Sequence, residues 1–254
     1  MAGKIDFNCD MGESFGMYKM GFDEEVIKYI SSANIACGFH AGDPMWMRHT
    51  IDLSEKHGVA VGAHPSFPDL NGFGRRVMNV TPEEAKNDLT YQIGALQAFT
   101  KTKKLQHVKP HGAMYNMAVN DEELGRAICE AILDVAPDMV LIALAGSRWI
   151  EIAEDMGLRV AREIFADRAL NSDGTLVSRS QEGSVIHDIS EVVERSLKMV
   201  TEGKAIAING DEIEVRADSL CLHGDTPGAV EMAKSLKREL EAAGVEIVPV
   251  GRLV

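Results

Sequence analysis

The chain has 254 residues, of which 45% are hydrophobic and 26% are charged, and its formal net charge at pH 7 is −13. This composition is typical of folded domains and excludes wholesale disorder, while the acidic balance argues against nucleic-acid binding and against binding to anionic membranes. The most apolar run, 139–145, is much shorter than the roughly 20 residues that span a bilayer, so we expect no membrane segment. Four scattered cysteines without a CxxC pair indicate a reducing compartment, the cytoplasm.

Short apolar runs alternate along the chain with longer segments of helical periodicity. We expect strands near 4–9, 33–39, 59–63, 106–110, 139–144, 159–164, 218–222 and 245–248. We expect helices near 23–30, 44–57, 82–101, 121–135, 147–156, 188–201 and 228–243. Capping signals support several of these helices, for example Thr81-Pro82-Glu83-Glu84 at the start of the third.

Seven or eight strand–helix units in one chain favour a TIM-like parallel β/α barrel, distorted or incomplete, over an open doubly wound sheet. No linker rich in proline or glycine divides the sequence, so 1–254 is expected to form one domain. The segments 205–208 and 212–215 flank Asn209-Gly210-Asp211 and predict a small hairpin insertion near 204–216.

Polar residues collect where the predicted strands end, which is where a parallel barrel forms its active site. Because side chains alternate along a strand, Asp6, Asn8 and Asp10 are expected to share one face. Four histidines end four different predicted strands: His40, His64, His111 and His223. We expect these histidines to converge with Asp10 in one functional site.

The residue types of this site are compatible with more than one kind of chemistry. Asp10 with His64 and His111 would suit a divalent metal such as zinc, or the same groups could act as general acid and base. Lys109 shares a strand face with His107 and His111. It could bind a phosphate or carboxylate, or form a buried ion pair with Glu163 or Asp10.

Two long connections, 65–80 and 165–183, are expected to close over an anionic small molecule. The first carries Arg75 and Arg76, and the second carries Asp167 and Arg168; pairing of surface arginines with surplus acids is the alternative. The loops beginning at His40 and His223 each open a helix, where glycine and free N–H groups favour anions. No GxxxxGK[ST] or GxGxxG fingerprint is present, which argues against a P-loop or Rossmann nucleotide site.

Long ordered strings across the chain carry a family resemblance. They are DFNCDMGES (6–14), NIACGFHAGDP (34–44), GAHPSFPD (62–69), GFGRR (72–76), VKPHGA (108–113), FADR (165–168) and LHGDTPGAV (222–230). With these strings the sequence resembles the LamB/YcsF family, which is the family of the bacterial 5-oxoprolinase A subunit. The resemblance extends from near Lys4 to the last strand.

The resemblance implies an incomplete, seven-stranded barrel of the glycoside hydrolase/deacetylase type. It also implies ATP-dependent opening of the 5-oxoproline ring to L-glutamate, performed together with subunits B and C. ATP with Mg is then the expected cofactor, and a protein-bound divalent metal is a further possibility. Two other interpretations stay open: a stand-alone metal-dependent amidohydrolase or deacetylase on the same barrel, and a non-catalytic substrate-binding subunit.

These expectations assign roles to particular residues. The predicted catalytic residues are Asp10, His64, Lys109, His111, Glu163 and Asp167. The residues predicted to bind substrate or phosphate are Asn8, Glu13, His40, Arg75, Arg76, Arg168, His223, Gly224, Asp225 and Thr226. Asp10 with His64 or His111 is expected to activate water, and Glu163 or Asp167 to orient the base.

Overall fold

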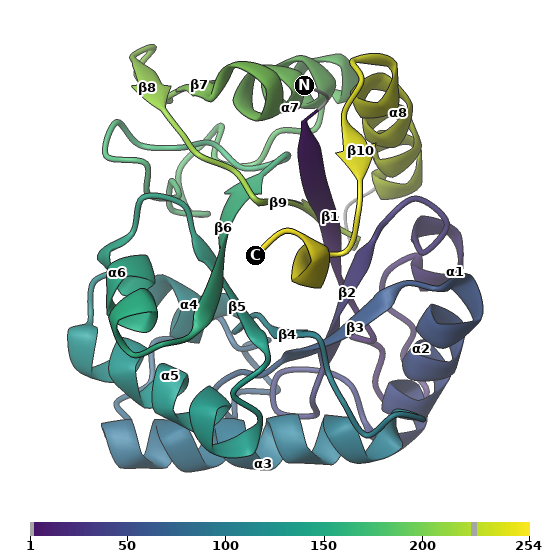
Figure 1. Cartoon of the computed structure of the whole chain (residues 1–254), viewed down its shortest axis with the longest axis vertical. Helices are drawn as coiled ribbons and strands as arrows, with labels where there is room; N and C mark the ends of the chain where they lie inside the picture. The colour runs from purple at the N-terminus through teal and green to yellow at the C-terminus, as the bar shows by residue number, and fades with distance from the viewer. Residues whose placement is uncertain (1–2, 225–227) are drawn as a thin grey trace.

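In the computed structural model, which describes residues 3–224 and 228–254, seven parallel strands close into a ring (Figure 1). The strands of the ring are β1 (Lys4–Met11), β2 (Ser32–Ala36), β3 (Ala60–His64), β4 (His107–Val108), β5 (Val140–Leu144), β6 (Arg159–Phe165) and β9 (Ser219–His223). Each strand pairs with the next in this order, and β9 pairs with β1 to complete the barrel. The predicted seven-stranded TIM-like barrel is confirmed.

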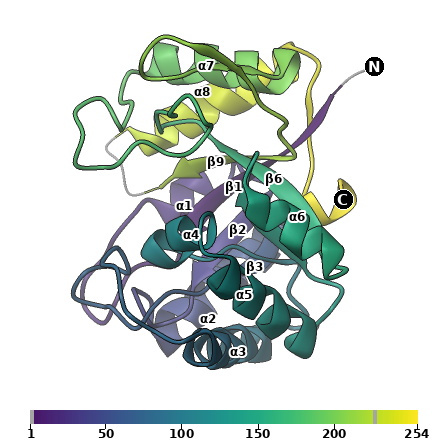
Figure 2. The same cartoon turned by 90° about the vertical axis from the view of Figure 1, so that its left-hand side faces the viewer.

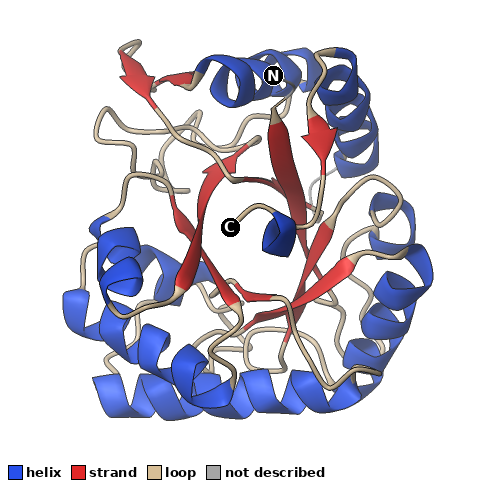
Figure 3. Ribbon diagram, in the orientation of Figure 1, coloured by secondary structure: helices blue, strands red, loops and turns tan. Residues whose placement is uncertain are grey.

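Helices cover the outside of the ring (Figure 3). They are α1 (Asp23–Val26), α2 (Pro44–His57), α3 (Pro82–Phe99), α4 (Gly112–Ala118), α5 (Glu122–Val135), α6 (Arg148–Asp155), α7 (Ile189–Glu202) and α8 (Ala229–Ala242). The capping box of Thr81 and Glu84 forms as predicted, with each side chain bonded to the other's backbone N–H. Among the described residues, no helix is long and apolar enough to cross a membrane.

Two helices differ from the sequence prediction. The expected helix 23–30 ends at Val26, because the N–H of Ser31 already donates to the carbonyl of Phe7 and draws the chain into the sheet. Helix α4 was not predicted, since seven residues are too few to show a helical period in the sequence.

The C-terminal residues close the end of the barrel where the strands begin. The expected strand 245–248 forms β10 (Glu246–Ile247), which in the described part of the chain pairs with Lys4 and Ile5 of β1 and lies outside the ring. The 3₁₀ turn η1 (Val250–Arg252) follows and lies over the centre of the ring in Figure 1. Val250 is fully buried against residues of β5 and β6, so this end of the barrel is filled.

The opposite end of the barrel carries the long connections. Figure 2 shows these loops on the side of the molecule away from both chain ends. They follow the carboxyl ends of the strands, where the polar residues were predicted to gather. The predicted hairpin also forms, as the antiparallel pair β7 (Lys204–Ile206) and β8 (Glu212–Glu214).

Candidate functional site

The deepest polar layer inside the barrel is built around Asp6. Its carboxylate accepts hydrogen bonds from the hydroxyls of Ser31, Ser32 and Ser219, at 2.7, 2.6 and 2.5 Å. Burial raises the pKa of Asp6 to about 6, and the three hydroxyl bonds limit the rise. This layer ties β1 to β2 and β9 below the site.

A second layer links β1, β2 and β4 through amides. Asn34 donates to the side-chain oxygens of Asn8 and Asp10, at 2.7 and 2.8 Å, and His107 Nε2 donates to Asn34 Oδ1 at 2.8 Å. Burial lowers the pKa of His107 to about 3, so its ring is neutral. Gly62 makes room for that ring, because a Cβ at this position would lie 2.1 Å from His107 Nε2.

Lys109 lies at the centre of the site in a buried ion pair. Its Nζ is 3.0 Å from Asp10 Oδ1, 2.9 Å from Glu163 Oε1 and 2.9 Å from Cys221 Sγ. Burial alone would lower the pKa of Lys109, but the neighbouring carboxylates and Cys221 raise it well above its usual range. The hydroxyl of Tyr115 donates to Glu163 Oε2 at 2.7 Å and fixes that carboxylate. Of the alternatives for Lys109, the structure has the ion pair.

The carboxylate of Asp10 contacts two neighbouring side chains, Lys109 and His64. Besides Lys109, its Oδ2 lies 3.4 Å from His64 Nε2. Burial alone would raise the pKa of Asp10, but His64 and Lys109 hold it well below its usual range. Asp10 is therefore an ionised carboxylate that lines the cavity described below.

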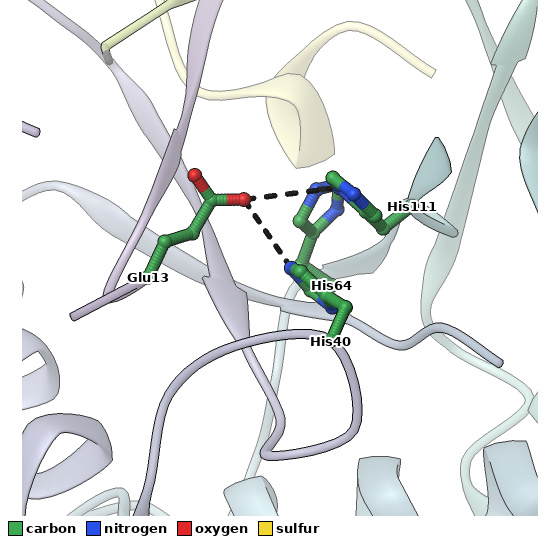
Figure 4. Close-up of side chains that lie close together, drawn as sticks. All are labelled: Glu13, His40, His64 and His111. Atoms are coloured by element: carbon green, nitrogen blue, oxygen red, sulfur yellow. Dashed lines mark hydrogen bonds and ion pairs between the residues drawn. The ribbon is translucent and has the colours of Figure 1, made fainter. Parts of the chain in front are cut away.

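Three of the predicted histidines gather with Glu13 beyond Asp10 (Figure 4). His111 Nδ1 lies 2.9 Å from His64 Nε2, and Glu13 Oε1 lies 3.2 Å from His40 Nε2 and 3.7 Å from His111 Nδ1. The rings of His40 and His111 stack, with centroids 3.8 Å apart and an angle of 3° between their planes. Ligand atoms of these four residues all lie within 4.8 Å of one another, so the group could hold a metal ion.

His223 forms a separate pair with Asp167 on the other side of the site. Its Nδ1 lies 3.0 and 2.9 Å from the two carboxylate oxygens of Asp167. Its Nε2 accepts from Arg179 at 3.2 Å, and its ring stacks on Phe165. Burial alone would raise the pKa of Asp167, but His223 holds it below its usual value. The carboxylate thus fixes His223 with a hydrogen on Nδ1.

A cavity of about 670 Å³ opens above these groups at the carboxyl ends of the strands. Asp10, His64, Lys109, His111 and His223 all line it, so three of the four predicted histidines meet Asp10 here. The fourth, His40, does not line the cavity but packs against His111 and Glu13, because β2 ends at Ala36.

Three arginines from the two long connections also line the cavity: Arg75, Arg168 and Arg179. Arg75 lies over the ring of Phe73 at 4.8 Å. Burial lowers the pKa of Arg168 to about 10, which still leaves it charged at neutral pH. The cavity lining therefore combines arginine and lysine cations with the carboxylate of Asp10 and the imidazoles of His64, His111 and His223.

Other predicted residues lie away from the cavity. Arg76 is largely exposed and binds the carboxylate of Asp69, which is the surface pairing considered as the alternative. Gly224 lies behind the site, where a Cβ would be 3.1 Å from Cys9 Sγ. Asp225 and Thr226 lie outside the described residues.

Several residues of the site were missed, among them Arg179 and Cys221, which contact His223 and Lys109. Tyr115 lies on the unpredicted helix α4 and offered no signal in the sequence. Asn34 was detectable, because it is a polar residue in the middle of an apolar strand and pairs in register with Asp10.

Comparisons with known proteins show the family and a shared fold. The LamB/YcsF family profile matches residues 5–254. The chain is 58% identical to the 5-oxoprolinase A subunit of Thermococcus onnurineus over 99% of each chain. Its sequence is 49% identical to that of the lactam utilization protein from Thermus thermophilus. The crystal structure of that protein matches this chain with a TM-score of 0.91, over 96% of this chain and 99% of that chain. A T48 deacetylase shares the fold at 15% identity, with a TM-score of 0.52 over 99% and 90% of the two chains.

Proposed function

This chain belongs to the LamB/YcsF family, and on that premise we propose that it is the A subunit of an ATP-dependent 5-oxoprolinase. In this role it opens the lactam ring of 5-oxoproline to give L-glutamate, in the cytoplasm and together with subunits B and C. The observation that carries the proposal is the name of the Thermococcus relative, which is similar to this chain over nearly its whole length.

The reaction needs groups of three kinds. A five-membered lactam is a stable amide, and transfer of the γ-phosphoryl group of ATP to its oxygen would make the ring carbon open to attack by water. Breaking the C–N bond and releasing phosphate then gives glutamate, ADP and phosphate. Such chemistry requires cations for phosphate and carboxylate, a base for water, and donors for the developing oxyanion.

The cations that line the cavity fit the anionic groups of this reaction. Arg75 and Arg179 extend from the two long connections, so they are placed to receive the substrate carboxylate or a phosphoryl group. Lys109 is held below them by Asp10 and Glu163. We assign Lys109 to fixing the charge and position of Asp10 and to stabilising negative charge that develops above it.

The lining of the cavity offers two candidate bases. Asp10 lies beside His64, which contacts His111, and we assign water activation to this group. His223 is the other candidate, since Asp167 orients its ring and leaves Nε2 toward Arg179 at the cavity. Glu163 contacts Lys109, Asn8 and Tyr115, so its role is to position the ion pair.

The proposal is tested by measuring glutamate formation from 5-oxoproline and ATP with Mg, using this chain with and without subunits B and C. We expect activity only in the complete mixture. Asp10→Ala and His111→Ala should each abolish glutamate formation while the circular dichroism spectrum stays that of the parent chain. Full activity in both variants would refute the assigned site.

A second candidate function rests on the cluster of His40, His64, His111 and Glu13, a donor set suited to a divalent metal. A stand-alone amidohydrolase or deacetylase would hydrolyse small amides without ATP or partner subunits. The same assay distinguishes the two, because glutamate formation that needs neither ATP nor partners would favour this candidate.

A further inference from the structure

We propose that His64 Nε2, His111 Nδ1 and Glu13 Oε1 bind one divalent cation of the zinc class. As a part of the reaction this inference rests on the proposed function, whereas the binding itself rests on the geometry of the three side chains. The site differs from the sequence prediction in its carboxylate, which is Glu13 in place of Asp10.

The hydrogen bonds made by the imidazole rings of His64 and His111 give the first argument. His64 Nδ1 lies 2.6 Å from the carbonyl oxygen of Lys109, and His111 Nε2 lies 2.8 Å from the carbonyl oxygen of Phe73. A carbonyl can only accept, so each of these outer nitrogens carries a hydrogen. In two neutral rings the inner nitrogens would then meet lone pair to lone pair at 2.9 Å. A positive charge must lie between them, either as a shared proton or as a metal ion.

The distances between the ligand atoms give the second argument. Ligands bound to zinc at 2.0–2.1 Å in a tetrahedron lie about 3.3 Å from one another. His64 Nε2 and His111 Nδ1 are 2.9 Å apart, and Glu13 Oε1 is 3.7 Å from His111 Nδ1. Both distances from His111 Nδ1 thus lie near the spacing that the ion requires, and ligand atoms of His64 and Glu13 lie within 4.8 Å of each other.

The surroundings of the two rings are those of metal-binding histidines. Such a histidine usually donates its second ring N–H to a carbonyl or carboxylate, which fixes its orientation. Both His64 and His111 do so, through carbonyls on two different segments. Both rings also line the cavity, so the ion would have a coordination position open to substrate or water.

His40 completes the cluster as a positioning residue. Its Nε2 contacts Glu13 Oε1 at 3.2 Å, and its ring stacks on His111, so it holds both proposed ligands in place. Its Nδ1 has no hydrogen-bond partner among the described residues. Because it lacks the acceptor that the other two rings have, we do not assign His40 as a ligand.

A second group of potential ligands, Asp10, Cys221 and His223, is less suitable. The ammonium of Lys109 lies 2.9 Å from Cys221 Sγ and 3.0 Å from Asp10 Oδ1. The Lys109 cation already neutralises Asp10 and contacts the sulfur of Cys221, and a metal ion there would face it directly. The histidine pair with Glu13 is therefore the favoured site.

The test uses the full chain, freed of metal by a chelator, desalted and titrated with zinc chloride by isothermal titration calorimetry. We expect one equivalent to bind, with affinity weakened about 100-fold or more in His64→Asn, His111→Asn and Glu13→Gln. His57→Asn, which removes an exposed histidine at the end of α2, is the matched control and should bind like the parent chain. Zinc X-ray absorption of the parent complex should show two imidazole ligands.

Three results would overturn the inference: no binding by the parent chain, unchanged binding in the His64 and His111 variants, or loss of binding in Asp10→Asn with Glu13→Gln unaffected. Thermal unfolding of each variant without zinc shows whether it is folded. The X-ray absorption spectrum is measured on the parent chain, so it tests the ligands even if a variant does not fold. Glutamate formation by metal-free chain with its partners would leave the proposed function standing if zinc fails to bind. One equivalent of bound zinc without glutamate formation under any condition would support the metal site and contradict the proposed function.

Discussion

Both carboxylate oxygens of Asp167 lie within 3.0 Å of Nδ1 of His223, although 56 positions separate the two residues in the chain. The pair joins the end of β6 to the end of β9, which are neighbouring strands of the ring. Asp167 therefore fixes both the tautomer and the direction of His223, and Nε2 is left toward Arg179 at the cavity.

Replacing Asp167 by Asn should lower kcat for glutamate formation in the assembled complex by about 10²-fold or more. Only one of the two terminal atoms of the Asn side chain can accept a hydrogen bond from His223 Nδ1. The amide also lacks the negative charge that favours the tautomer with a hydrogen on Nδ1. Steady-state kinetics would check this, with little change expected in KM. Asp188→Asn is the matched control, since Asp188 caps α7 and Asn caps helices equally well. Equal losses in the two variants would contradict the role of Asp167.

Replacing Lys109 by Met should destabilise the fold by about 3 to 5 kcal/mol, because Asp10 and Glu163 would be left buried without their counter-charge. Urea unfolding measures the effect. Adding Glu163→Gln to Lys109→Met should recover part of the loss, since it removes one of the unpaired charges. Strictly additive losses in the double variant would show that the two side chains do not interact.

Replacing Gly62 by Ala should destabilise the chain by about 1 to 3 kcal/mol, because the new methyl group would overlap the His107 ring within a packed barrel. Gly94→Ala provides the matched comparison, since Gly94 lies in helix α3 with open space around it. That variant should be more stable than the parent chain by about 0.5 to 1 kcal/mol. Thermal and urea unfolding of both variants would check the opposite signs.

Asp6 should make stability depend on pH. Its pKa is about 6 in the folded chain, against 3.8 as the ordinary value. Burial disfavours the ionised form of Asp6, so ionisation of this group lowers the free energy of unfolding. This loss of stability is nearly complete above pH 6, becomes smaller as the pH falls and is gone below about pH 4. Relative to Asp6→Asn, the parent chain should gain about 1 to 1.5 kcal/mol between pH 7.5 and pH 5. Urea unfolding of both chains at the two pH values measures the difference, and a constant difference would contradict it.

Much of the site could be predicted because the barrel imposes two simple rules. Alternation along β1 placed Asp6, Asn8 and Asp10 inside the ring, where all three form hydrogen bonds across strands. The position of His64 and His111 at strand ends predicted that they would meet.

The loops obeyed no such rule. Arg75 and Arg76 are adjacent in sequence, yet Arg75 lines the cavity and Arg76 binds Asp69 on the surface. Which of two neighbouring side chains turns inward depends on the backbone path of the loop, and Phe73 adopts a positive φ of 54° there. His40 is a related case, because β2 ends at Ala36 and a bend carries the imidazole to Glu13. Tertiary contacts, and not the local pattern, decide these positions.

The turn at Val250–Arg252 fills the end of the barrel where the strands begin, whereas the cavity of the described residues opens at the opposite, loop end. A partner that passes a compound into this cavity is expected to contact the segments after β3, β4 and β6 that line it. A chain tethered to a bead or sensor chip through Val254 would keep that open end turned toward the solution.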